Sequence, residues 1–204
     1  AIAEDTTSLF YNALRGQAES IVLKNEKIEL TLNTKGATVE KAVIKGFDDY
    51  KGNKEITLFD GEDQKLSYTL SAKETNISTS DLYFVPSAVT DSTVTFTAEA
   101  TQGKSLTIEY RLGADYMLHM KMYAEGMQGL FAPGTQTMDV NWKDKCRQQE
   151  KGFMFENRYA TLTYHNTDGG TDYLSETSAE EDEPTEEKTD WIAFKNQFFS
   201  AVMI

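Results

Sequence analysis

Cysteine, histidine, positive charge and long apolar runs are all scarce in this chain of 204 residues. The single cysteine, Cys146, excludes an internal disulfide and a cysteine-based zinc site. Only His119 and His165 are present to serve as the base of a nucleophilic triad. The longest apolar runs, such as residues 201–204, are far shorter than the roughly 20 residues that a membrane-spanning helix needs. These residues are therefore not expected to cross a bilayer as a helix.

Acidic residues dominate the charge of the chain. The 33 acidic residues outnumber the 20 basic ones and give a net charge of −13. A field of this sign repels phosphate backbones and anionic lipid head groups, so no nucleic acid is expected as a partner. The acids are densest over residues 178–188, where a proline and the lack of apolar anchors predict a solvated, mobile loop.

Motifs for metal, phosphate or covalent chemistry are not found. None of the 13 glycines belongs to a phosphate-binding loop, and residues 60–63 and 168–172 lack the spacing of an EF-hand. No metal, no cofactor and no catalytic residue is predicted. Cys146, between Lys145 and Arg147, is either a reactive thiol of lowered pKa or an inert side chain, and the inert interpretation is favoured.

Along most of the chain, turn residues separate short runs in which apolar and polar residues alternate. Cap residues and apolar spacing predict one short helix over residues 5–14. From residue 20 the apolar period becomes two, as in Ile28, Leu30 and Leu32. Further strands are predicted at residues 39–44, 56–59, 66–70, 94–98, 106–110, 116–122 and 158–165, with a long sheet-crossing loop over 127–151. This spacing is typical of an all-β antiparallel sandwich or barrel.

The densest aromatic cluster of the chain lies in residues 190–199, which read Asp-Trp-Ile-Ala-Phe-Lys-Asn-Gln-Phe-Phe. This segment resembles the signature of the large periplasmic domain of YidC-type membrane protein insertases. Residues 21–47 resemble the opening strands of that domain, with Ala37 where the family usually has a second glycine, and residues 110–118 resemble its mid-domain strand pair. The signature residues are Trp191, Phe194, Gln197, Phe198 and Phe199.

The resemblance implies a β-supersandwich similar to that of galactose mutarotases, at the periplasmic face of a bacterial inner membrane. Residues 1–19 would be an N-terminal linker with the short helix, and residues 20–204 the periplasmic domain. The parent would be a multi-pass inner membrane protein, with a spanning helix before residue 1 and others after residue 204. Family domains normally continue past the tryptophan segment, so residues 201–204 would be an unpaired apolar strand that favours dimers of the fragment.

The function implied by the resemblance involves no covalent chemistry. The domain would assist the insertion and folding of integral membrane proteins, alone or with the Sec translocon. Its partners would be accessory subunits of the translocon, while nascent membrane proteins would be handled mainly by the membrane-embedded part. The signature aromatics are either an interface or core, and core is favoured because alternate residues of a strand point into a sandwich interior.

A mutarotase-like fold leaves an alternative open, a carbohydrate-binding module or a sugar epimerase. The enzymes of that fold use histidine and glutamate for acid–base catalysis. His119 is predicted on a polar strand face and His165 at a strand end, and neither belongs to a recognisable motif. Sugar binding without turnover would use Trp142 or tyrosines as stacking platforms. A histidine and a carboxylate within hydrogen-bond reach in one concave site would favour the enzyme.

Overall fold

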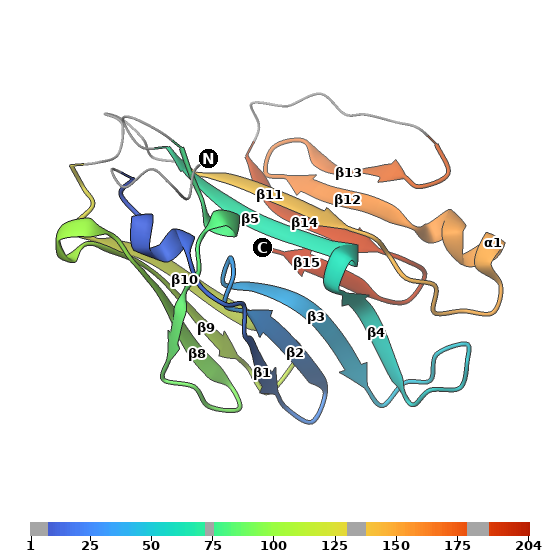
Figure 1. Ribbon diagram of the computed structural model, residues 1–204. Coiled ribbons are helices and arrows are strands. Elements are labelled where there is room, and N and C mark those ends of the chain that lie inside the picture. The colour runs from blue at the N-terminus through green and yellow to red at the C-terminus, as the bar shows by residue number, and fades with distance from the viewer. Residues whose placement is uncertain (1–7, 72–75, 130–137, 179–187) are drawn as a thin grey trace.

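Hairpin pairing of strands that follow one another in the sequence builds most of the molecule (Figure 1). The computed structural model describes residues 8–71, 76–129, 138–178 and 188–204. The strands are β1 (Ser20–Lys24), β2 (Ile28–Asn33), β3 (Thr38–Lys45), β4 (Glu55–Asp60), β5 (Gln64–Ser71), β6 (Asn76–Ser78), β7 (Val85–Ser87), β8 (Thr93–Glu99), β9 (Ser105–Leu112), β10 (Leu118–Glu125), β11 (Asp139–Asp144), β12 (Thr161–Asn166), β13 (Gly170–Ser175), β14 (Thr189–Lys195) and β15 (Ser200–Met203). The helical turns are η2 (Tyr11–Leu14), η3 (Gly61–Asp63), η4 (Thr79–Asp81), η5 (Thr101–Gly103), α1 (Phe153–Glu156) and η6 (Asn157–Tyr159).

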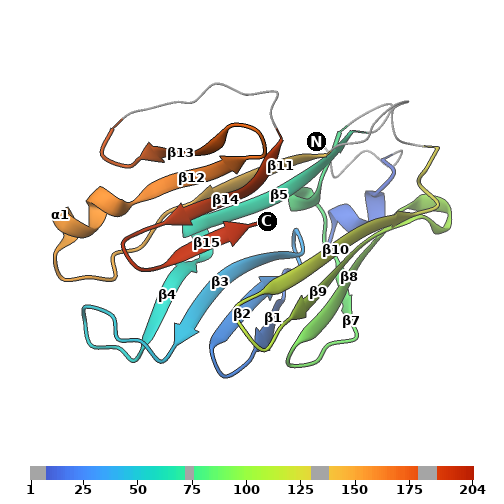
Figure 2. The same cartoon turned by 180° about the vertical axis from the view of Figure 1, so that it is seen from behind.

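The strands form antiparallel sheets, which confirms the prediction of an all-β antiparallel fold. Two four-stranded sheets, in the orders β1-β2-β3-β4 and β10-β9-β8-β7, share one hydrophobic core. A three-stranded sheet, β11-β5-β6, and a four-stranded sheet, β13-β12-β14-β15, lie at the other side of the molecule (Figure 2). The short helix predicted over residues 5–14 begins outside the described residues, and its described part contains the 3-10 turn η2. The division into residues 1–19 and 20–204 stays a prediction.

Alternation of apolar and polar residues places the core where the sequence predicts it. In β2, Ile28, Leu30 and Leu32 are buried, and the residues between them are only partly covered. Strands β8 and β9 turn Phe96 and Ile108, both fully buried, toward the same interior. Each such side chain contributes about 1.5–3 kcal/mol by leaving water. The core therefore stabilises the N-terminal two thirds of the chain.

The turn between β2 and β3 explains the glycine that the family usually has at the position of Ala37. Gly36 and Ala37 both have left-handed backbone angles, with φ of 82° and 48°. A residue with a Cβ adopts this region at a cost, which glycine avoids. The carbonyl oxygen of Ala37 accepts a hydrogen bond of 2.8 Å from the buried hydroxyl of Tyr110. That bond ties the two sheets of the core together.

The prediction of an irregular crossing loop over residues 127–151 is wrong in its middle. Residues 139–144 form β11, which pairs in full antiparallel register with β5, for example Trp142 with Leu66. The run Asp-Val-Asn-Trp-Lys-Asp is too polar to be recognised as a strand, and its partner lies more than seventy residues away. The strand predicted over residues 158–165 begins later than expected, at Thr161 in β12, and Arg158 lies in the helical turn η6. The predicted acidic loop falls almost entirely outside the described residues.

Burial is uneven between the two halves. Among the described residues after Met127, the buried apolar side chains are those of Ala160 and Ala193. The buried polar side chains there are Gln149, Glu156, Asn166 and Asn196. The sheet of β12–β15 packs onto β11 through the edge-to-face contact of Phe194 with Trp142. This half is therefore held by polar contacts and half-buried aromatic rings, and the candidate site lies in it.

Candidate functional site

The aromatic signature spans β14, the turn after it and the start of β15. Trp191 is half-buried and stacks on the ring of His165, with centroids 5.9 Å apart. Phe194 lies on the opposite face of the strand, three residues on, and meets Trp142 at 4.8 Å. Phe199 contacts Phe47 edge-to-face at 5.6 Å. The aromatic side chains of this segment thus contact three different parts of the chain, at His165, Trp142 and Phe47, and do not pack together in one core.

The expectation that the signature aromatics are core is wrong for Phe198, whose side chain is 65% exposed. Trp191, Phe194 and Phe199 are only partly covered, as is Gln197. The reason lies in the turn at residues 196–199. In a strand, consecutive side chains point to opposite faces of the sheet. Phe198 and Phe199 lie in a turn instead, so neither is directed into a sandwich interior by strand geometry.

Asn196 is the residue of this segment that sequence reasoning missed. Its buried amide nitrogen Nδ2 donates to Glu156 Oε1 at 3.1 Å and to the carbonyl oxygen of Arg147 at 3.2 Å. Its Oδ1 accepts from the backbone N–H groups of Phe198 and Phe199. The amide therefore shapes the turn and anchors it to a distant segment at the same time.

Glu156, at the end of α1, is a buried carboxylate held by N–H groups. It accepts from the backbone N–H groups of Gln149, at 2.9 and 3.1 Å, and of Glu150, at 3.1 Å, besides the amide of Asn196. Gln149 in turn donates its side-chain Nε2 to the carbonyl oxygen of Thr57 in β4. A carboxylate is usually assigned to the surface from sequence, so only an apolar neighbourhood such as Phe-Met-Phe-Glu hints at burial.

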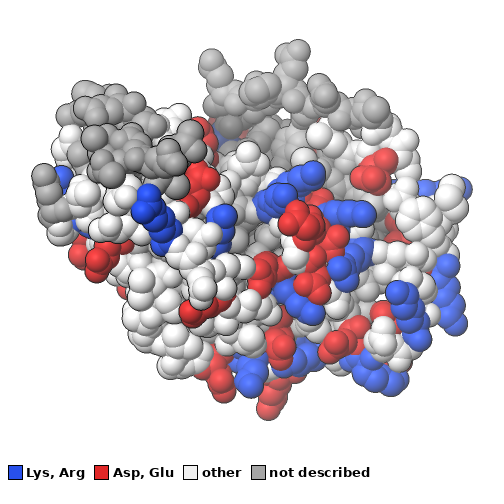
Figure 3. All heavy atoms as spheres, viewed as in Figure 1, with Lys and Arg blue, Asp and Glu red and all other residues white. Residues whose placement is uncertain are grey.

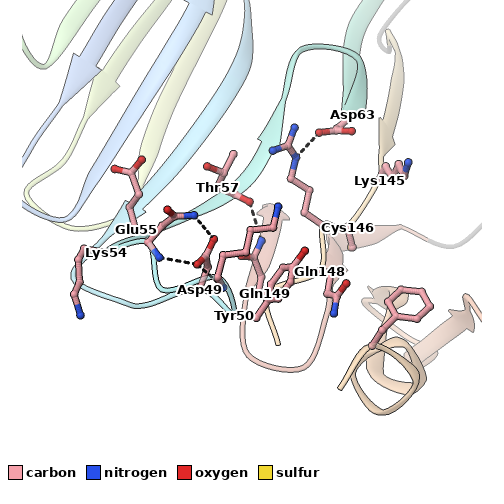
Figure 4. Close-up of a pocket in the computed structure, with 14 residues that line it drawn as sticks. Asp49, Tyr50, Lys54, Glu55, Thr57, Asp63, Lys145, Cys146, Gln148 and Gln149 are labelled. Carbon is pink, nitrogen blue, oxygen red and sulfur yellow. Dashed lines mark hydrogen bonds and ion pairs between the residues drawn. The ribbon is translucent and has the colours of Figure 1, made fainter. Parts of the chain in front are cut away.

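A polar cleft of about 700 Å³ opens beside this network (Figure 4). One wall is the loop after β3, including Tyr50, and the other is the segment from Lys145 to Gln149. The walls are joined because the backbone N–H of Tyr50 donates to the carbonyl oxygen of Gln149 at 2.8 Å. Arg147 pairs with Asp63 across one end. The volume lies in the range of small-ligand pockets, and the lining offers amides and ion pairs.

Comparison with known proteins assigns the chain to a family. The sequence model of the YidC periplasmic domain matches residues 20–204. The chain belongs to the YidC periplasmic domain family. It is 42% identical over 201 residues to the membrane protein insertase YidC of Phocaeicola vulgatus, which covers 98% of this chain and 32% of that protein. It is 37% identical to YidC of Bacteroides fragilis strain YCH46, over 99% of this chain and 32% of that protein. The chain thus spans about a third of the length of these relatives.

Membership of the YidC periplasmic domain family associates the chain with the inner membrane, on its periplasmic side. Within the described residues, no helix is long and apolar enough to span a bilayer. The family assignment confirms the expectation drawn from the tryptophan segment. It does not favour the alternative of a carbohydrate-binding module or a sugar epimerase.

The histidines of this YidC domain are not placed for acid–base catalysis in the cleft. His119 is exposed on β10, as predicted, and His165 lies on β12. Nε2 of His165 is 3.7 Å from Asp190, beyond hydrogen-bond distance, and its Nδ1 contacts Thr171 at 3.0 Å. Neither histidine lines the cleft. In the part of the chain that the structure describes, no three His, Cys, Asp or Glu side chains are grouped to hold a metal ion.

Cys146 is the remaining candidate for reactivity, and its surroundings make the thiol inert. Burial, with a smaller contribution from the nearby carboxylates of Asp144 and Glu176, raises the pKa of Cys146 to about 12. The positive neighbours in the sequence, Lys145 and Arg147, do not lower it. The interpretation as a reactive thiol of lowered pKa is therefore wrong, and the inert interpretation holds.

Proposed function

We infer that this chain is the periplasmic domain of a membrane protein insertase and that it assists the insertion and folding of integral membrane proteins. The observation that carries this proposal is the family match over residues 20–204, together with relatives that are named membrane protein insertases. Nascent membrane proteins are the substrates of the whole protein. The domain acts without covalent chemistry, as a module for binding and positioning.

The proposal extends to cooperation with the Sec translocon. The domain contacts accessory subunits of the translocon, and the membrane-embedded part of the protein handles the substrate chain. A domain in this role needs a rigid body with a defined surface for contact. The network of Gln149, Glu156 and Asn196 supports such a role, because it fixes β4, α1 and the β14–β15 turn relative to one another.

The test uses the full-length protein in proteoliposomes, with and without the residues that correspond to 20–204. Insertion of a single-span protein is measured by protease protection, in the presence and absence of the Sec translocon. We expect removal of the domain to reduce translocon-dependent insertion and the co-purification of accessory subunits, and to spare translocon-independent insertion. Unchanged co-purification and unchanged insertion would overturn the proposal.

A second measurement addresses the absence of catalysis. Polarimetry of freshly dissolved glucose or galactose follows the interconversion of the anomers. We expect the rate with the chain present to equal the spontaneous rate, because neither histidine lines the cleft. An acceleration that is proportional to protein concentration would contradict a non-catalytic role.

A further inference from the structure

Large apolar side chains are exposed together at one end of the molecule. The residues, with their exposed fractions, are Phe47 (47%), Phe153 (52%), Met154 (73%), Phe155 (52%), Tyr159 (43%) and Phe198 (65%). We call this set the apolar end. Single exposed apolar residues are common in proteins, whereas a group of this size on one part of the surface marks an interaction site.

The apolar end is assembled from segments that the polar network holds together. The bond from Asn196 to Glu156 keeps the turn that carries Phe198 beside α1. The ring of Phe155 packs on Tyr159 at 5.5 Å, and Phe47 is fixed by its contact with Phe199. Both ribbon views place α1 at the outer extremity of the molecule (Figures 1 and 2). The exposed side chains thus sit on a prepositioned, projecting surface.

On this projection the exposed basic residues outnumber the exposed acidic ones, with Lys51, Lys54, Lys151 and Arg158 against Asp48 and Glu55. Lys151 and Arg158 are exposed on either side of α1, and Glu156, the acidic residue between them, is turned into the interior. Figure 3 shows basic side chains at the right-hand edge of the face, with acidic ones among them, where α1 and the loop between β3 and β4 lie. Aromatic and Met side chains flanked by Lys and Arg are the pattern of segments that lie in the membrane interface.

A lipid bilayer fits this surface better than a protein segment that would bind in a groove. The apolar side chains project from α1 and from the turns that carry Phe47 and Phe198, whereas the cleft beside them is lined mainly by charged and amide residues, with Phe153 among them. The net charge of −13 repels anionic lipid head groups, so the apolar end, where exposed basic residues outnumber acidic ones, is the part best able to approach them. We propose that the apolar end docks this domain onto the anionic surface of the lipid bilayer.

Hydrophobic contact carries most of the expected affinity. Glu150, next to Lys151 in the sequence, and Asp48, which pairs with Lys54 at 2.7 Å, limit the local positive charge, so the electrostatic part is modest. Attachment to a membrane-resident parent would raise the local concentration of the domain at the bilayer, which makes a weak contact effective. The inference rests on the membrane location of the family and does not require any step of insertion.

The experiment measures binding of the 204-residue chain to vesicles by flotation. One set of vesicles contains phosphatidylethanolamine and phosphatidylglycerol, and the other contains phosphatidylcholine alone. We expect binding to the anionic vesicles, weaker binding to the neutral ones, and a partial loss as ionic strength rises, because salt screens only the charge contribution.

Variants assign the binding to the apolar end. We expect Met154→Glu and Phe198→Glu each to weaken binding about tenfold or more, and Lys151→Gln to weaken it about fivefold. The matched control is Val85→Glu, which replaces a 67% exposed apolar residue on β7 with the same charge. All of these side chains are exposed, so unchanged melting midpoints are expected to show that the variants remain folded.

Each possible result of the vesicle experiment either supports or overturns the proposal. Loss of binding in Met154→Glu and Phe198→Glu, with binding retained in Val85→Glu, supports the proposal. No binding of the unaltered chain to anionic vesicles, or equal binding by all variants, overturns it. Because insertion is not measured, a negative result here leaves the proposed insertase function untouched.

Discussion

The amide of Asn196 lies 3.1 Å from the carboxylate of Glu156, and both groups are buried. None of the ion pairs among the described residues involves Glu156. Its negative charge is instead stabilised by N–H donors from Gln149, Glu150 and Asn196. Hydrogen bonds to a charged acceptor are stronger than those between neutral groups, so this contact is a sensitive point of the C-terminal half.

Replacing the amide with a carboxylate tests that contact. In Asn196→Asp, two carboxylates would face each other at hydrogen-bond distance, and we expect a loss of about 3–5 kcal/mol at neutral pH. The loss should shrink as the pH falls, because one of the pair binds a proton in the folded state more readily than in the unfolded state. Urea unfolding at several pH values measures this, with Gln197→Glu as the neighbouring control. A deficit independent of pH would contradict the contact.

Trp191 is expected to contribute less to stability than its place in the signature suggests. It is half-buried against His165, whereas Phe96 is fully buried in the core. We therefore expect Trp191→Ala to cost about 1–2 kcal/mol, and Phe96→Ala about 3–5 kcal/mol. Urea denaturation of the two variants measures the difference. Equal losses would show that the sheet of β12–β15 is as tightly packed as the core.

The core could be predicted from the sequence because its pattern is local. Ile28, Leu30 and Leu32 alternate within one strand, and alternation needs no knowledge of the partner strand. The strand β11 could not be predicted in this way, because its pairing with β5 is a long-range contact that leaves little trace in the run around Trp142. Local periodicity thus predicts strands that face one core, and it misses strands that are defined by their partner.

The candidate site depends on contacts between residues that are far apart in the sequence. The tryptophan segment is recognisable as a family signature, but nothing in its sequence distinguishes Asn196 as the residue that anchors it. Its partner Glu156 is forty residues away, and a glutamate is assigned to the surface by default. Buried polar networks of this kind arise from tertiary placement alone, so their members cannot be identified from spacing.

The thiol of Cys146 is expected to react slowly in the folded chain. Burial raises its pKa from 9.0 to about 12, which lowers the thiolate fraction near neutral pH about a thousandfold. A maleimide should therefore label Cys146 slowly without denaturant and quickly in urea. The matched control is Phe198→Cys in a Cys146→Ser background, because position 198 is exposed. Rapid labelling of native Cys146 would contradict its burial.

Asp144 links stability to pH in the region between β11 and β15. Burial and, to a lesser extent, the charge of Asp63 raise the pKa of Asp144 from 3.8 to about 6, against the opposing effect of the hydrogen bond from the N–H of Lys145. Its Oδ1 is buried without a hydrogen-bond partner, and its side chain lines a cavity of about 20 Å³ with Cys146 and Phe194. The folded state therefore favours the protonated carboxyl group.

The sign of the pH dependence follows from the raised pKa. The contribution of the protonated group to stability is complete below the unfolded pKa of about 3.8 and is lost as the pH rises through about 6. We expect Asp144→Asn to be more stable than the unaltered chain near neutral pH, by about 1–2 kcal/mol after allowance for solvent screening. The difference should shrink as the pH falls from about 6 and should vanish below the unfolded pKa of about 3.8.

Urea unfolding at a series of pH values compares Asp144→Asn with the unaltered chain. Subtracting the two curves removes the titration of the other carboxylates that both chains share. Asp139→Asn, an exposed substitution on the same strand, controls for the loss of one negative charge from an acidic chain. If both substitutions stabilise equally and at every pH, the gain comes from the overall charge, and the buried carboxyl of Asp144 is not its source.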